Sequence, residues 1–202
     1  MTVLDPPRPP FPYFGGKQRI ADRIVAMFPE HGHYVEPYCG SLSVLAAKPR
    51  SQMETVNDLD QSVMTFWRVL RDRPTDLVRA CALTPHSRAE LELARERYDE
   101  DLDEVEIARR LWVNLAQGRN GGLRHPGWRT YITAGTHSIG LPGYLDAYVD
   151  RLAAMAERLH HVSLECRPAL RVIENYGASP DVLLYVDRSE EHTSELQSHS
   201  DL

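Results

Sequence analysis

The chain has 202 residues, of which 42% are hydrophobic and 26% charged, and its formal net charge is −6. This composition is typical of a globular protein with one sizeable core, or a core with an inserted lobe. No apolar run approaches the roughly 18 residues that a membrane span requires, and the N-terminus lacks the apolar stretch of a secretory signal.

The three cysteines, Cys39, Cys81 and Cys166, are odd in number and far apart. No Cys-x-x-Cys or Cys/His pair has the spacing of metal ligands. The sequence therefore predicts a reduced, cytoplasmic protein without a metal site.

The N-terminal third predicts alternating strands and helices. Five prolines precede Tyr13, Gly15 and Gly16 form a tight loop, and a helix runs from Lys17 until Pro29 stops it. Residues 34–36 read as a strand, 37–40 as a turn, and a helix capped by Ser41 or Ser43 continues to Ala47. A second short strand over 53–60 ends in acidic residues, and apolar residues at helical spacing follow over 60–72. This order predicts a parallel sheet with crossover helices.

The middle of the chain has a different pattern. Residues 75–82, 87–98 and 104–117 are predicted helices, and the second begins with the capping-box sequence SRAE at 87–90. A long Gly- and Arg-rich stretch follows, then a helix over 144–159. Strand, helix and strand return over 161–166, 168–176 and 181–187. Two α/β pieces thus flank a helical insertion of about 85 residues.

Charge is unevenly distributed along the chain. Residues 107–145 hold five arginines and no acid, whereas residues 188–202 hold one arginine and four acids. The middle is therefore a basic segment that suits a polyanionic partner, although the net charge argues weakly against one.

Two stretches have the features of a ligand site. YVEPYCGSLSVL, residues 34–45, reads as strand, glycine turn and helix N-terminus, and Asp58 follows Glu36 by 22 residues at the next strand end. Such an acid accepts hydrogen bonds from ribose hydroxyls. An ordinary glycine turn followed by a solvated acid is the alternative interpretation of this segment. NAD is disfavoured because G-x-G-x-x-G is absent. Asp187 ends LLYVD, where ligands of open α/β sheets bind; a strand-end cap is the alternative.

Four segments in this order resemble the Dam-like, D12 class of adenine-specific DNA methyltransferases: PYFGGK (12–17), YVEPYCGSLSVL (34–45), VNDLDQSVMTFWRVLRD (56–72) and DVLLYVD (181–187). The resemblance covers residues 12–187. It implies an α/β, Rossmann-like S-adenosylmethionine-dependent fold, here with an incomplete sheet, and a mostly helical target-recognition insertion. The implied parts are a cofactor-binding part over 1–72, the insertion over 73–160, a return to the sheet over 161–187, and a non-native tail over 188–202.

The resemblance also implies site residues. Asp187 would be the catalytic acid, accepting an N–H bond of the adenine amino group after the base is flipped out of the duplex. S-adenosylmethionine would be bound by residues of all four segments: Tyr13, Gly15, Gly16, Lys17, Glu36, Pro37, Tyr38, Gly40, Asp58 and Asp187. Double-stranded DNA would be contacted by Arg119, Asn120, Arg124, Trp128 and Arg129. An ordinary surface loop is the alternative for this last group.

Trp112 lies on an apolar helical stripe and is predicted to be in the core. His33, His160 and His161 have no partner pattern and are not expected to be catalytic. The implied protein is a monomer that needs neither a membrane nor a metal.

The sequence departs from the family pattern in two places. Leu42 stands where the second glycine of the loop is often found, and Asp187 is followed by Arg188-Ser189-Glu190 in place of Pro-Pro-Tyr. The tail RSEEHTSELQS resembles a translated sequencing-library adapter. We therefore expect a chain truncated after the first residue of D-P-P-Y, inactive or nearly so, with exposed strand edges that favour aggregation. A non-enzymatic DNA-binding remnant and a methyltransferase for RNA or protein are the alternatives.

Overall fold

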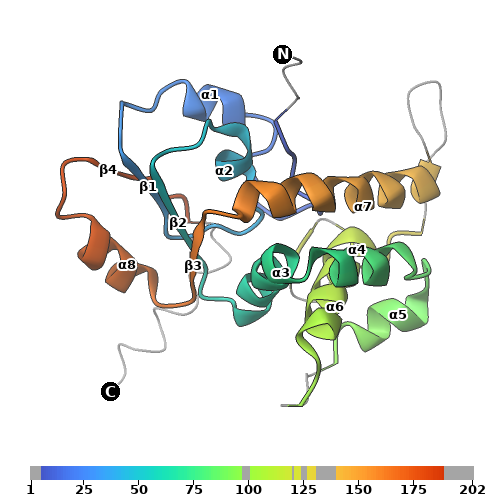
Figure 1. Ribbon diagram of the computed structural model, residues 1–202. Helices are drawn as coiled ribbons and strands as arrows, with labels where there is room; N and C mark the ends of the chain where they lie inside the picture. Colours follow the sequence, from blue (N-terminus) through green and yellow to red (C-terminus); the bar gives the residue numbers. More distant parts are fainter. Residues whose placement is uncertain (1–5, 97–100, 120, 124–126, 131–139, 189–202) are drawn as a thin grey trace.

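The sheet of this protein has four parallel strands in the order β3-β2-β1-β4, as seen in a computed structural model that describes residues 6–96, 101–119, 121–123, 127–130 and 140–188 (Figure 1). The strands are β1 (His33–Glu36), β2 (Met53–Asn57), β3 (Ser163–Glu165) and β4 (Val182–Leu184). In register, Tyr34 lies opposite Glu54 on β2 and Leu183 on β4. The predicted α/β class with a parallel sheet is confirmed.

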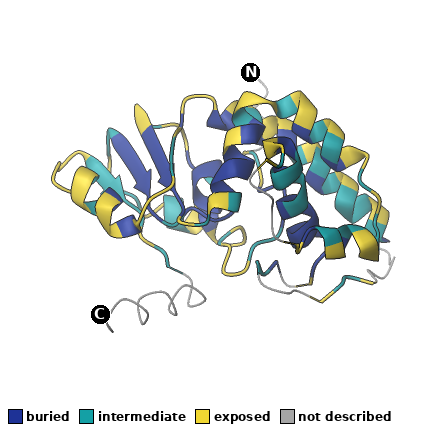
Figure 2. Ribbon diagram, turned by 90° about the horizontal axis from the view of Figure 1, so that it is seen from below, coloured by how far each residue is buried: buried dark blue, intermediate teal, exposed yellow. Residues whose placement is uncertain are grey.

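Alternate side chains of β1 point to opposite faces of the sheet. Helices cover both of these faces. Tyr34 contacts Phe28, with ring centroids 5.9 Å apart, on the face covered by α1 (Ala21–Val25) and α2 (Ser43–Ala47). His33 contacts Tyr176 of α8 (Ala169–Tyr176) on the other face, at 5.2 Å. The two inner strands are accordingly almost wholly buried, as parallel strands require (Figure 2).

The remaining helices form a lobe beside the sheet (Figure 1). They are α3 (Gln61–Asp72), α4 (Pro74–Ala82), α5 (Arg88–Leu93), α6 (Glu104–Ala116) and α7 (Gly140–Leu159). Trp67 and Trp112 are fully buried there, which confirms the prediction for Trp112. A single hydrophobic core runs from the sheet into this lobe, and α3 connects the two parts because it follows β2 and packs against α6 and α7.

Several predicted boundaries were wrong. The helix expected from Lys17 to Pro29 is reduced to Ala21–Val25, and Met27, within the predicted range, is 82% exposed. The α7 helix begins at Gly140, before the predicted residue 144. The last strand ends at Leu184, three residues before Asp187. Short elements depend on their packing partners more than on their own pattern, so their ends are poorly predicted.

Two predicted helix caps do not form. Ser87 stands at the N-cap of α5 without a side-chain capping bond, and Glu90 bonds Arg109 instead, at 2.6 Å. The N-cap of α2 is Leu42, and the hydroxyl groups of Ser41 and Ser43 bond each other at 2.9 Å. A cap does form on α3, where the Asp60 carboxylate accepts the backbone N–H groups of residues 62 and 63.

Within the described residues, no helix is both long and apolar enough to cross a membrane.

Candidate active site

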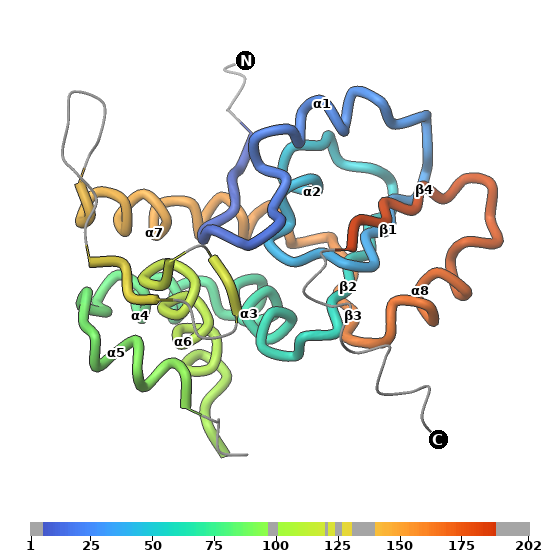
Figure 3. Tube along the Cα trace, turned by 180° about the vertical axis from the view of Figure 1, so that it is seen from behind, coloured from blue at the N-terminus to red at the C-terminus, as the bar shows by residue number. Residues whose placement is uncertain are grey.

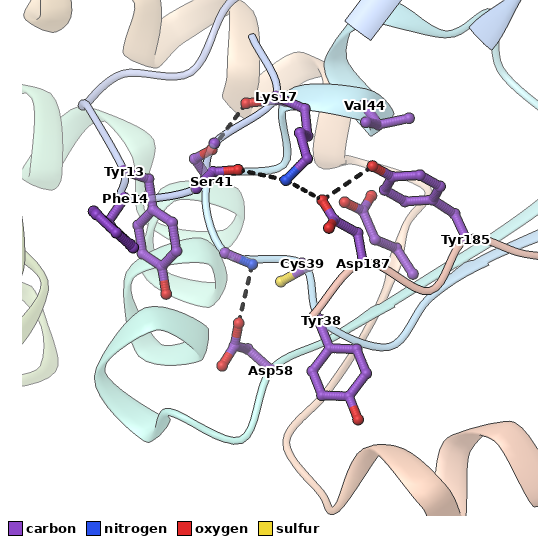
Figure 4. Close-up of a pocket in the computed structure, with 15 residues that line it drawn as sticks. Tyr13, Phe14, Lys17, Tyr38, Cys39, Ser41, Val44, Asp58, Tyr185 and Asp187 are labelled. Carbon is purple, nitrogen blue, oxygen red and sulfur yellow. Dashed lines mark hydrogen bonds and ion pairs between the residues drawn. The ribbon is translucent and has the colours of Figure 1, made fainter. Parts of the chain in front are cut away.

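A small cavity of about 40 Å³ lies where β1, β2 and the segment after β4 reach the carboxyl edge of the sheet (Figure 4). It is lined by residues from four stretches of the chain: Tyr13, Phe14, Gly15, Gly16, Lys17, Glu36, Tyr38, Cys39, Gly40, Ser41, Ser43, Val44, Asp58, Tyr185 and Asp187. This edge is where open α/β sheets bind their ligands.

Asp58 follows the last residue of β2 and holds the glycine loop in place. Its Oδ2 accepts the backbone N–H of Gly40 at 3.0 Å, and its Oδ1 accepts that of Asp60. The indole N–H of Trp67 donates to the Gly40 carbonyl at 2.9 Å. The loop after β1 is therefore attached both to the neighbouring strand end and to α3.

The glycine loop has a left-handed backbone at two residues. Gly40 has φ +44°, and a Cβ atom there would lie 2.6 Å from the Tyr13 ring. Leu42 has φ +56° and is fully buried. A non-glycine residue in this region costs roughly 1–2 kcal/mol, which explains why glycine suits position 42 and why burial must hold leucine there.

Asp187 reaches the cavity from beyond β4. The chain stays extended after Leu184, because the Tyr185 N–H donates to the Val35 carbonyl at 2.9 Å. The Asp187 carboxylate pairs with Lys17 at 2.6 Å and accepts the Tyr185 hydroxyl at 3.1 Å. The Lys17 and Asp187 side chains are 30% and 29% exposed, so this ion pair lies at the solvent-exposed part of the cavity. The nearby carboxylate is one reason why the pKa of Tyr185 is raised, after burial itself.

Glu36 is a buried acid of the cavity. Its side chain accepts the Tyr34 hydroxyl at 2.9 Å and a backbone hydrogen bond from Leu45. Burial raises the pKa of Glu36 to about 8, and the charges of Asp187 and Asp58 add to this effect. Glu36 is therefore mostly protonated at neutral pH in the structure as it stands.

The N-terminal segment that carries Tyr13 and Lys17 lies between the sheet and the helical lobe (Figure 3). The Phe14 N–H donates to the Gly121 carbonyl at 2.9 Å. The indole N–H of Trp112 donates to the carbonyl of Pro10 at 3.0 Å. The inserted lobe thus holds one wall of the cavity directly.

Three of the five residues predicted to contact DNA lie within the described part of the chain. Arg119 is exposed. Trp128 stacks on His86 with ring centroids 4.9 Å apart, and the Arg88 guanidinium lies 4.3 Å from the centroid of the Trp128 ring. Arg129 donates to the Gly118 carbonyl and lies over the Tyr144 ring. The other two residues lie outside the described residues: Asn120 and Arg124.

The cavity brings together nearly all residues that the sequence proposed for cofactor binding. Pro37 is the exception: it does not line the cavity, and its carbonyl accepts the side-chain amide of Asn57 at 2.9 Å. Sequence reasoning missed Tyr185, although side chains two residues apart in an extended chain point the same way. It also missed lining residues of the two glycine-containing loops and of the first turn of α2: Phe14, Cys39, Ser41, Ser43 and Val44.

No group of three or more His, Cys, Asp or Glu in the described residues is placed to hold a metal ion.

A comparison with curated proteins finds no match. Residues 13–112 match the model of the D12 class N6 adenine-specific DNA methyltransferase family, and this stretch holds Lys17, Glu36 and Asp58. The matched family acts in DNA adenine methylation. Sequence order, cavity and family match agree, and residues 13–112, about half of the chain, carry a domain of the D12 class N6 adenine-specific DNA methyltransferases.

Proposed function

We propose that this chain is the S-adenosylmethionine-binding part of an enzyme that methylates the exocyclic amino group of adenine in duplex DNA. The main support is the meeting of Lys17, Glu36, Asp58 and Asp187 at one cavity, although up to 170 positions separate them in the sequence. Residues 1–72 and 161–187 would form the Rossmann-like catalytic part, and residues 73–160 the recognition insertion.

The residues of the cavity suit the cofactor chemically. Bound S-adenosylmethionine supplies a methyl group on a positively charged sulfur. Three carboxyl groups, those of Glu36, Asp58 and Asp187, favour such a cation, and an acid at the end of the second strand, such as Asp58, accepts hydrogen bonds from ribose hydroxyls. The open space of about 40 Å³ is far below the roughly 300 Å³ of the smallest usual ligand sites. We infer that the loop of Gly15 and Gly16, which precedes Lys17, moves outward when the cofactor binds.

Asp187 would act on the adenine rather than on the cofactor. The amino nitrogen shares its lone pair with the ring, and a carboxylate that accepts one of its N–H bonds helps to localise that pair for attack on the methyl group. The ion pair with Lys17 competes for this carboxylate at Oδ2, and opening the pair would leave both oxygens to the amino group. Because both side chains are partly exposed, breaking this ion pair costs little free energy.

We also propose that the chain as it stands is inactive or nearly so. Arg188 follows Asp187 where the family has proline, and the aromatic residue that stacks on the flipped base is missing from the next two positions. Binding and transfer should therefore separate in this protein.

Titration calorimetry tests the cofactor site. We expect S-adenosylmethionine to bind the wild-type chain and the affinity to fall tenfold or more in Asp58→Asn, which loses one carboxylate acceptor. The control is Asp103→Asn, because Asp103 is an exposed partner of Arg73 and lies outside the cavity. Duplex DNA binding without cofactor binding would favour the non-enzymatic alternative.

Methyl incorporation from the tritiated cofactor tests the reaction. We expect background incorporation into duplex DNA, RNA and protein alike. Clear incorporation into DNA would overturn the proposed inactivity, and incorporation into RNA or protein would overturn the proposed substrate.

A further inference from the structure

Two buried glutamates on the same face of the sheet have opposite surroundings. Glu36 and Glu54 are 3% and 4% exposed, and both share the face of Tyr34, which lies opposite Glu54 in the sheet register. The Glu54 carboxylate binds Lys48 Nζ at 2.8 Å and Arg158 Nη2 at 2.8 Å. No Lys, Arg or His of the described residues forms an ion pair with Glu36.

The charged groups around Glu36 make this difference larger. Asp58 approaches from the end of β2 and Asp187 from beyond β4, and both add negative charge. Lys17, the lysine that lines the same cavity, is paired with Asp187. Lys48 is engaged by Glu54 and affects Glu36 only through space.

The remaining groups around Glu36 are neutral near pH 7. Tyr34 donates its hydroxyl to the carboxyl group, and the backbone of Leu45 adds a second hydrogen bond. Tyr185 and Cys39 lie nearby, and burial raises the pKa of each above its ordinary value, so both stay neutral. A buried carboxyl group with two donors and no countercharge keeps its proton until a cation arrives.

We propose that Glu36 holds a proton in the free protein and releases it to solvent when the sulfonium of the cofactor binds, which makes Glu36 a specificity-determining residue for the charged ligand. This inference rests on the proposed function and assigns a chemical reason to the selection of the sulfonium over its neutral thioether product. The O–H bond of the Glu36 carboxyl breaks, the proton passes to water, and the carboxylate stays to face the cation.

The test is proton release on binding, measured by calorimetry at pH 6.5 in two buffers with very different ionisation enthalpies. At this pH the amino group of the cofactor, with an ordinary pKa of about 7.7–8.0, stays protonated and contributes little. We expect close to one proton released for each S-adenosylmethionine bound, and an apparent affinity that rises about tenfold per pH unit between pH 5.5 and 7. S-adenosylhomocysteine, which lacks the sulfonium charge, should release clearly less.

Two variants separate the role of Glu36 from a folding defect. Glu36→Gln keeps an acceptor for the Tyr34 hydroxyl and should bind the cofactor with no proton release above that of the cofactor itself. Tyr34→Phe removes a donor to the carboxyl group and should keep the release. Thermal unfolding of each variant shows that it is folded.

Release that persists in Glu36→Gln, or equal release with both ligands, would overturn the inference while leaving cofactor binding intact. No binding of S-adenosylmethionine by the folded wild-type chain would instead contradict the proposed function itself.

Discussion

At the scale of single residues, the acids of the cavity differ in their exposure to water and in their ion pairs. Asp187 is partly exposed and paired with Lys17, whereas Glu36 is buried and meets only neutral donors. Glu54 is buried too, but hydrogen bonds from Arg158 and Lys48 outweigh the effect of burial and lower its pKa. The same residue type is thus neutral at one buried position and charged at the other, because a buried carboxylate needs a cation.

The raised pKa of Glu36 predicts how stability depends on pH. Since the folded state holds this proton up to about pH 8, the contribution of Glu36 is largest below its ordinary pKa and is lost as the pH rises toward 8. The free energy of unfolding should fall by up to about 1.4 kcal/mol per pH unit between pH 5.5 and 8. Urea denaturation should show this slope in the wild type and a flatter one in Glu36→Gln. Equal slopes would contradict the prediction.

At the scale of elements, two of the contacts between the inserted lobe and the rest of the molecule can be tested separately. Gly121 touches the segment that carries Tyr13, and Arg158 near the end of α7 reaches under the sheet to Glu54. Arg158 also donates to the Leu45 carbonyl of α2 at 3.2 Å. The lobe therefore contacts both the segment that carries Tyr13 and the sheet with its helix α2.

Gly121→Ala should weaken the first contact. Gly121 has φ +62°, and an added Cβ would lie 2.7 Å from the Pro12 carbonyl oxygen, so the backbone itself must move. We expect a loss of about 2 kcal/mol or more in the free energy of unfolding, and weaker cofactor binding. Gly122→Ala is the matched control, because nothing lies within 4 Å of its added Cβ, and it should be nearly neutral. Similar effects of the two changes would argue against the contact.

Arg158→Met should weaken the second contact. It removes one of the two cations that pair with buried Glu54 and leaves Lys48, which typically costs about 3–5 kcal/mol. Arg171→Met removes a partner of Glu174 on the exposed surface of α8 and should cost less than about 0.5 kcal/mol. Urea denaturation of both variants measures the difference, and a small loss for Arg158→Met would show that the buried ion pairs do not hold α7 to the sheet.

Charge is distributed unevenly over the whole molecule. The acidic cavity lies at the sheet, whereas the stretch over 107–145 holds arginines without acids. Of these arginines, Arg109 and Arg110 already pair with Glu106, and Arg129 packs over Tyr144. Among the described residues of this stretch, Arg119 is therefore the arginine best placed to reach a DNA phosphate.

Arg119→Ala should lower the affinity for duplex DNA with little dependence on sequence. The slope of log affinity against log salt should become shallower by about one unit, the value expected for one lost phosphate contact. Arg171→Ala, on α8, is the control and should leave the slope unchanged. Fluorescence anisotropy at several salt concentrations measures both, and an unchanged slope in Arg119→Ala would exclude this contact.

Periodicity alone was sufficient to predict the class of fold and the order of its elements. Apolar residues at the spacing of a helix or in short runs predicted the strands over 34–36, 53–60 and 161–166, and the helices over 75–82 and 104–117, because burial of one face imposes that spacing. The helix expected from Lys17 and the capping box at Ser87 failed, since packing partners and a competing arginine decided them.

The chain order of the motifs also indicated the family, and the residues of the cavity with it. Distances between remote segments, however, follow only from the folded chain. The sequence does not show that Lys17 pairs with Asp187 or that Trp128 packs on His86. It also does not show that Glu54 pairs with two cations, whereas no ion pair of Glu36 is present among the described residues. Local patterns specify local structure, whereas charge state and access to water depend on which side chains the tertiary fold brings within a few ångströms.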